Sequence, residues 1–147
     1  MRALVLVALL AGCAAPSLPR APLPLRNPTA PVASQLDATL ARLSGDWVVV
    51  QGAGMAPGTA LGFGPGSVRI GGAALPASDT GKGRLMLGGQ AVWVHWLDAD
   101  NRTAAMGDPG GGRVWIMDRT GAPGERLTAA REILSWYGYD LARLEAR

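Results

Sequence analysis

Hydrophobic and polar positions change their period along the chain, from strand-like in the centre to helical near the end. Short apolar runs recur through the centre, each bounded by glycine, aspartate or asparagine, a pattern typical of strands joined by tight turns. Residues 52–66 break this pattern, because they are rich in glycine and contain two prolines, and we expect a long loop or lid there. The predicted strands are 46–51, 67–70, 84–87, 91–97, 103–106 and 113–119.

Two segments have a helical period instead. Residues 35–43, preceded by the capping residue Ser34, place three leucines on one face, and Gly45 ends this short helix. Residues 125–137 form a longer helix that ends before Gly138. Its apolar stripe consists of Leu127, Ala130, Ile133, Leu134 and Tyr137. The order of elements predicts an all-β antiparallel barrel or sandwich with one C-terminal helix packed outside it.

The start of the chain has the pattern of an export signal. Arg2 is followed by nine apolar residues, 3–11, too few for a spanning helix, which needs roughly 20. Leu10-Ala11-Gly12-Cys13 resembles the bacterial lipobox, which implies cleavage after residue 12 and a lipid on Cys13. In that pattern Ala14 indicates sorting to the outer membrane. The resemblance therefore predicts a lipid-anchored protein on the periplasmic side of the outer membrane of a Gram-negative bacterium.

Residues 13–34 are predicted to form a lipidated, proline-rich tether ahead of a domain at 35–147. Six prolines in this segment exclude a regular helix or a central strand. At about 3.1 Å per residue, an extended spacer of this length holds a domain roughly 60 Å from the bilayer. The alternative is a docking peptide for an aromatic groove on a partner.

Composition narrows the function classes. Hydrophobic residues make up 48% of the 147 residues, as in globular proteins. The net charge of +3 is scattered along the chain, so it does not indicate a nucleic-acid partner. One Cys excludes an intrachain disulfide, and one Cys with one His does not supply a zinc site. We expect no metal and no other cofactor, and the oligomeric state stays open.

Several segments resemble one protein family. Leu43-Ser44-Gly45-Asp46-Trp47 is similar to the G-x-W motif that opens the lipocalin barrel, and residues 114–120 (VWIMDRT) resemble its last strand. The resemblance covers residues 43–51 and about 91–144, including the terminal helix. It implies an up-and-down barrel closed at one end by Gly45, Trp47 and Arg119, with the guanidinium over the indole. It also implies an apolar ligand of the fatty-acid or lysophospholipid class and a role in envelope lipid handling.

The length of the chain leaves the ligand cavity open to question. Trp47 and Arg119 are 72 positions apart, whereas eight strands of about six residues with turns of about three need roughly 69. The barrel is therefore either complete with short strands or reduced by two strands. The size of the ligand cavity depends on the number of strands. The candidate cavity residues are Val49, His95, Trp96, Trp115 and Met117.

Catalysis is not indicated. His95 is the only histidine, and no motif supplies the nucleophile or acid that a catalytic base needs. Both faces of 91–97 are apolar, so the side on which His95 lies stays undecided. Two other functions remain as alternatives: a periplasmic protease-inhibitor-like barrel, and a structural lipoprotein whose barrel is filled by its own side chains.

Overall fold

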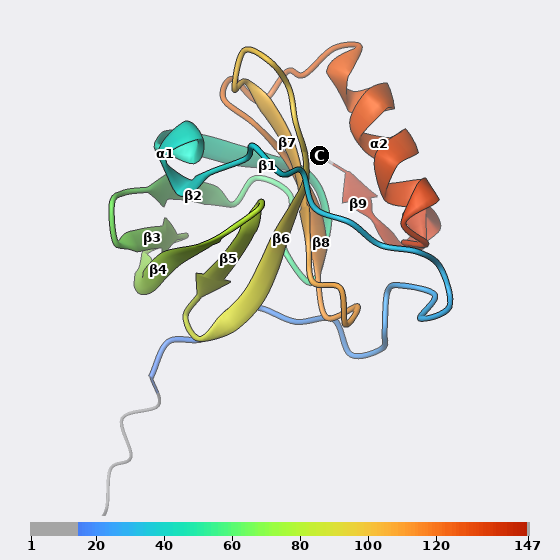
Figure 1. Ribbon diagram of the computed structural model, residues 1–147, viewed down its shortest axis with the longest axis horizontal. Helices are drawn as coiled ribbons and strands as arrows, with labels where there is room; N and C mark the ends of the chain where they lie inside the picture. Colours follow the sequence, from blue (N-terminus) through green and yellow to red (C-terminus); the bar gives the residue numbers. More distant parts are fainter. Residues whose placement is uncertain (1–14, 147) are drawn as a thin grey trace, which may run out of the picture.

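The apolar runs at the centre of the chain form strands that pair in sequence order and close into a barrel (Figure 1). The computed structural model describes residues 15–146. β1 pairs with β2 through its first half and with β8 through its second half, and this double pairing closes the sheet. The eight barrel strands are β1 (Gly45–Ala53), β2 (Ala60–Phe63), β3 (Ser67–Ile70), β4 (Ala73–Gly81), β5 (Arg84–Leu87), β6 (Gln90–Leu97), β7 (Thr103–Gly107) and β8 (Val114–Asp118).

The barrel is complete because many of its strands are short. β2, β3 and β5 have four residues each, and β7 and β8 have five. β2 lies inside the predicted loop 52–66, and β4 was not predicted at all. β4 contains Pro76, which has no N–H to donate to a neighbouring strand. The proline is tolerated because β5 ends at Leu87, and at this point only the Pro76 carbonyl is needed, as the acceptor for the N–H of Gly88.

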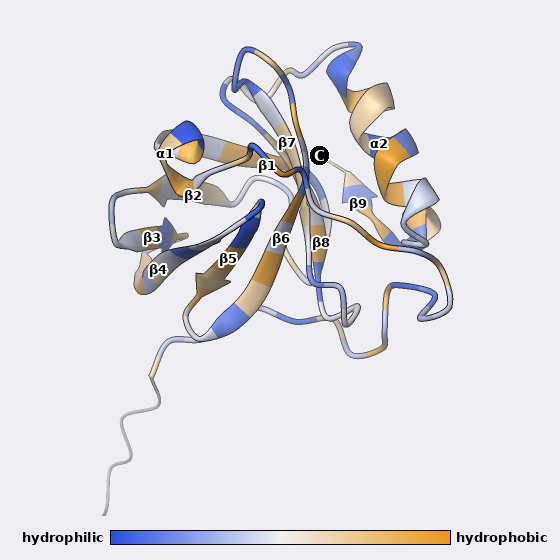
Figure 2. Ribbon diagram, in the orientation of Figure 1, coloured by the Kyte–Doolittle hydropathy of each residue, from blue (hydrophilic) through white to orange (hydrophobic). Residues whose placement is uncertain are grey.

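Apolar side chains divide into two buried clusters, one inside the barrel and one between its outer face and the C-terminal helix. Figure 2 shows apolar residues both on the barrel strands and along this helix. The helix, α2 (Arg126–Trp136), confirms the prediction for 125–137 and packs outside the sheet. A two-residue strand, β9 (Glu145–Ala146), extends the sheet beyond β1.

A single glycine, Gly138, ends α2. Gly138 has φ +82°, the left-handed conformation that glycine adopts without strain. Its N–H donates to Ser135 O at 3.0 Å, and the N–H of Tyr139 donates to Leu134 O at 3.1 Å. These two bonds form a Schellman motif and turn the chain back toward the barrel.

The first predicted helix is much shorter than expected. Only α1 (Leu40–Leu43) is helical, with Thr39 rather than Ser34 as its N-cap. Gln35 is held in an extended conformation by β6, because its N–H donates to Val94 O at 2.8 Å and its side chain bonds the backbone of Leu97. The helix therefore begins only after the chain has left β6.

Residues 15–34, which we call the strap, differ from the expected spacer. Leu18, Leu25 and Arg26 are buried, and the backbone of the strap bonds the β7–β8 connection through Ala21 N–Gly112 O (2.7 Å) and Leu25 N–Gly111 O (2.8 Å). The strap therefore packs along the barrel instead of extending away from it (Figure 1). Its prolines keep it extended, but its apolar side chains find burial against the barrel. The predicted signal peptide, 1–12, and Cys13 lie outside the described residues.

Candidate functional site: the two ends and the interior of the barrel

Trp47 and Arg119 come together at one end of the barrel. Cζ of Arg119 lies 3.8 Å from the ring centroid of Trp47, which is 2% exposed. The guanidinium also donates to backbone carbonyls, at 2.7 Å to Ser44 and at 3.0 Å to Asn101. The indole N–H donates to Leu43 O at 2.7 Å, so α1 is fixed to the same end. We call this the Trp47 end.

Gly45, the third residue expected at this end, leaves room for the guanidinium. Its φ is +100°, and a Cβ there would lie 3.0 Å from Nη1 of Arg119. Burial lowers the pKa of Arg119 and the nearby Asp46 carboxylate raises it, but the guanidinium stays charged. The arrangement combines a cation–π contact with hydrogen bonds to several carbonyls.

Three of the candidate cavity residues do point into the barrel. Val49, Trp115 and Met117 belong to the interior cluster and have no exposed surface. The same is true of Leu87, Val92, Val94, Ala104 and Met106. A space large enough for water beside these described side chains would give them accessible surface. The middle of the barrel is therefore filled by its own side chains.

The other two candidates, His95 and Trp96, lie outside the barrel. A bulge in β6 between Val94 and Trp96 adds one residue to the strand, so the inward and outward sides exchange at this point. Leu97 therefore joins the interior cluster, while Trp96 packs in the cluster beneath α2. The expectation that His95 and Trp96 line a cavity is wrong. His95 follows the inward Val94 and points outward by ordinary alternation, and the bulge turns Trp96 outward as well.

His95 links the strap to the C-terminal segment. Its Nδ1 lies 2.6 Å from Ala33 O in the strap, and its Nε2 lies 2.8 Å from Oη of Tyr139. Burial and, to a smaller extent, the charge of Arg26 lower the pKa of His95 to about 4, although the hydrogen bond to Ala33 acts in the opposite direction. The ring is therefore neutral at pH 7, and Nδ1 carries the hydrogen because a carbonyl only accepts. Through these hydrogen bonds the histidine ties β6, the strap and the C-terminal segment together.

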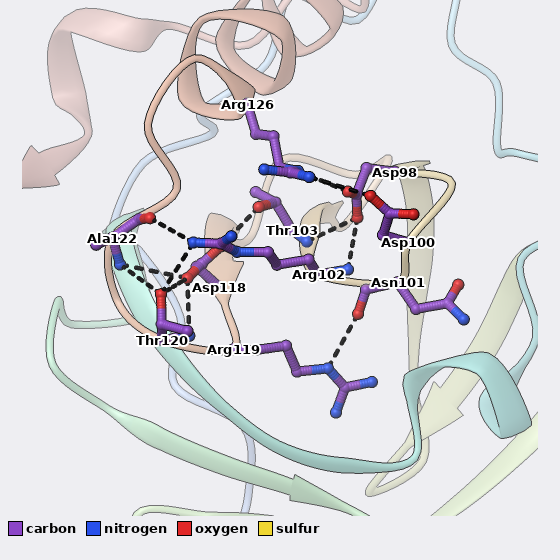
Figure 3. Close-up of polar contacts among 10 residues, drawn as sticks. All are labelled: Asp98, Asp100, Asn101, Arg102, Thr103, Asp118, Arg119, Thr120, Ala122 and Arg126. Atoms are coloured by element: carbon purple, nitrogen blue, oxygen red, sulfur yellow. Dashed lines mark hydrogen bonds and ion pairs between the residues drawn. The ribbon is translucent and has the colours of Figure 1, made fainter.

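A polar network fastens the start of α2 to the turn between β6 and β7 (Figure 3). Asp98 accepts from the backbone N–H groups of Arg102 and Thr103, and its other oxygen lies 2.7 Å from Nε of Arg126. Burial alone would raise the pKa of Asp98, but these hydrogen bonds and Arg126 hold it below its usual value. Asp118 is fully buried and bonds Thr103 and Thr120 at the end of β8. All these carboxylate oxygens have partners within the protein, so the network reads as structural.

The strap covers the opposite end of the barrel, which we call the strap end. The β1–β2 and β7–β8 connections, 54–59 and 108–113, lie there. Leu18 is 5% exposed and belongs to the interior cluster, together with Met55 of the first connection. Arg113 of the second connection donates from Nε to Pro19 O at 2.8 Å. Sequence patterns did not single out Leu18 or Arg113, since neither lies in a motif.

A pocket of about 550 Å³ lies beside the strap at this end. Its walls come from the strap, the end of β1, the β1–β2 connection and the C-terminal segment. They are largely apolar, and two arginines and one glutamate are among the lining residues. The lining residues are Pro19, Arg20, Ala21, Pro22, Leu25, Gly52, Ala53, Gly54, Met55, Ala56, Thr59, Arg143 and Glu145.

Within residues 15–146, no three His, Cys, Asp or Glu side chains are grouped so as to hold a metal ion. The helices of this described part are all too short or too polar to cross a bilayer. Comparison with known protein families and with curated proteins finds no match to this chain.

Proposed function

We propose that this protein is a lipid-anchored, lipocalin-like binding protein for a small apolar ligand of the fatty-acid or lysophospholipid class. The observation that carries the proposal is the pocket at the strap end. Its volume of about 550 Å³ falls in the usual range of ligand sites. Apolar walls suit an acyl chain, and the lining residues Arg20 and Arg143 suit an anionic head group.

The binding site in this proposal differs from the central cavity of the family that the sequence resembles. The interior residues are fully buried, so a ligand has no space in the middle of the barrel. The pocket beside the strap offers the alternative. A lipid on Cys13 would hold Leu18 within about 18 Å of the membrane, since five residues span at most that distance. The pocket would then lie near the bilayer, where acyl chains are available.

A titration with a dansyl-labelled fatty acid tests the proposal on the mature polypeptide from residue 14 onward. We expect saturable fluorescence enhancement in the micromolar range. Ala56→Trp, in the pocket wall, fills the pocket and should abolish it. Ala91→Trp, at an exposed position of β6, is the matched control and should bind as the wild type does. Equal binding by both variants, or none by the wild type, would contradict the proposal.

The filled interior favours a second candidate, a structural lipoprotein. Native mass spectrometry of the protein purified from membranes separates the two functions, because a structural barrel should carry no lipid beyond its own anchor. A protease-inhibitor function would require a free segment to present to the protease, whereas backbone hydrogen bonds hold the strap at Ala21 and Leu25, and Gln35 directly after it bonds β6. An inhibition assay with a secreted metalloprotease tests that alternative.

A further inference from the structure

The strap places an apolar side chain and a carbonyl oxygen side by side at the end of the barrel. Leu18 packs with the interior cluster, and the next residue, Pro19, offers its carbonyl to Nε of Arg113 at 2.8 Å. An acyl chain with an anionic head would need the same two environments: an apolar recess and a cationic donor next to it.

The buried guanidinium of Arg113 has more N–H groups than it has hydrogen-bond acceptors around it. Its side chain is 2% exposed, and Nη1 has no hydrogen-bond partner among the described residues. Oδ2 of Asp108 lies 3.7 Å from Nη1, close enough for an ion pair but too far for a hydrogen bond. A buried guanidinium N–H without an acceptor is costly, and the cost is relieved when an anion arrives.

We infer that Leu18 and Pro19 form a built-in occupant of the ligand site, which a single-chain amphiphile with a carboxylate or phosphate head displaces. The acyl chain takes the place of the Leu18 side chain, and the anionic head pairs with Arg113 in place of the Pro19 carbonyl. This inference rests on the proposed function, and it extends the pocket beside the strap into the barrel end beneath it. Binding of the ligand and release of the strap are then coupled, because each requires the other.

The first part of the strap is held mainly by arginine side chains: Nε of Arg113 donates to Pro19 O, and the Arg143 guanidinium donates to Leu23 O and Pro24 O. Its backbone contributes little, which suits this part to leave. Pro16, Pro19, Pro22 and Pro24 have no N–H to donate, so between residues 15 and 24 only Ala21 N forms a backbone hydrogen bond to the barrel. From Leu25 onward the strap is held more firmly, with Arg26 buried and bonded to Tyr137 O and Pro109 O. Residues 15–24 are therefore the part that moves, and Leu25 marks its hinge.

Affinity measurements on a strap variant test the displacement. Leu18→Ala weakens the built-in occupant, so dansyl-labelled fatty acid should bind about tenfold more tightly than to the wild type. Leu23→Ala is the matched control, because Leu23 lies on the same strap but is 66% exposed, and it should bind as the wild type does. A fatty acid and a lysophospholipid, each used as competitor, show whether carboxylate or phosphate is preferred at Arg113.

A second measurement uses the wild-type chain alone. Displacement frees residues 15–24, so trypsin should cleave after Arg20 several times faster when the fatty acid is present. Saturable binding with equal affinity for wild type and Leu18→Ala, or unchanged cleavage after Arg20, would overturn the inference and leave the proposed function standing. Absence of saturable binding in both proteins would overturn both.

Discussion

The guanidinium of Arg119 covers the indole of Trp47, with Cζ 3.8 Å from the ring centroid, although 72 positions separate the two residues. The contact joins the beginning of β1 to the residue after β8, the two strands whose pairing closes the barrel. The same guanidinium bonds carbonyls of Arg42, Ser44 and Asn101. One side chain therefore covers this barrel end next to the pair of strands that closes the sheet.

Arg119→Ala should destabilise the protein. Loss of the guanidinium exposes the Trp47 ring and leaves carbonyls without a donor, at a cost of about 1–3 kcal/mol. For a protein of this size the melting temperature should fall by roughly 3–15 °C. Thermal unfolding followed by circular dichroism measures the change, with Arg69→Ala, an exposed arginine of β3, as control. Equal melting temperatures for the two variants would show that the Arg119 contacts contribute little.

Cys13→Ser tests the anchor. The lipobox resemblance predicts that this variant is neither lipidated nor cleaved and does not reach the outer-membrane fraction. Membrane fractionation and labelling with radioactive palmitate check both points. A labelled band of mature size from the variant would rule out Cys13 as the attachment residue.

Leu134→Asp should unfold the protein. Leu134 is fully buried between α2 and the barrel, and an unpaired carboxylate there costs several kcal/mol, comparable to the whole stability of a domain. Ile133→Asp is the control, because the neighbouring side chain is only partly buried and lies outside the core clusters. The two variants should differ clearly in their urea unfolding midpoints. Similar midpoints would mean that α2 contributes little through this face.

Sequence patterns predicted the barrel strands best where glycine turns flank β-branched or apolar runs. The bounds of β3 and β5 agree with the prediction residue by residue. β2 and β4 were missed because glycine and Pro76 look like loop signals, whereas their pairing with neighbouring strands makes them extended.

The side of the sheet on which a residue lies was harder to predict. Bulges follow Val49 in β1 and Val94 in β6, and each shifts the alternation by one residue. No local signal marks either bulge, so Trp96 was placed on the wrong side. Leu18 was missed for a different reason: a proline-rich composition excludes helix and central strand, but it does not exclude packing of single side chains against a barrel.

The protein should lose stability between pH 6.5 and about pH 4 because of His95. Its pKa is lowered by burial to about 4 in the folded protein, whereas in the unfolded chain it is near 6.5. In this window the unfolded state binds the proton and the folded state does not, so acidification favours unfolding. A difference of this size corresponds to roughly 3 kcal/mol, lost progressively as the pH falls. Asp98 and Asp118 have lowered pKa values, so protonating them costs stability only at still lower pH.

Urea unfolding at a series of pH values measures this slope. His95→Gln does not titrate, so its free energy of unfolding should stay nearly constant between pH 6.5 and 4.5, even if it is lower than that of the wild type at pH 7. The two partners of the imidazole, the Ala33 carbonyl and the Tyr139 hydroxyl, do not titrate in this range, so the difference in slope reports on the imidazole. A wild-type slope equal to that of His95→Gln would show that His95 has the same pKa in the folded protein as in the unfolded chain, and would contradict the prediction.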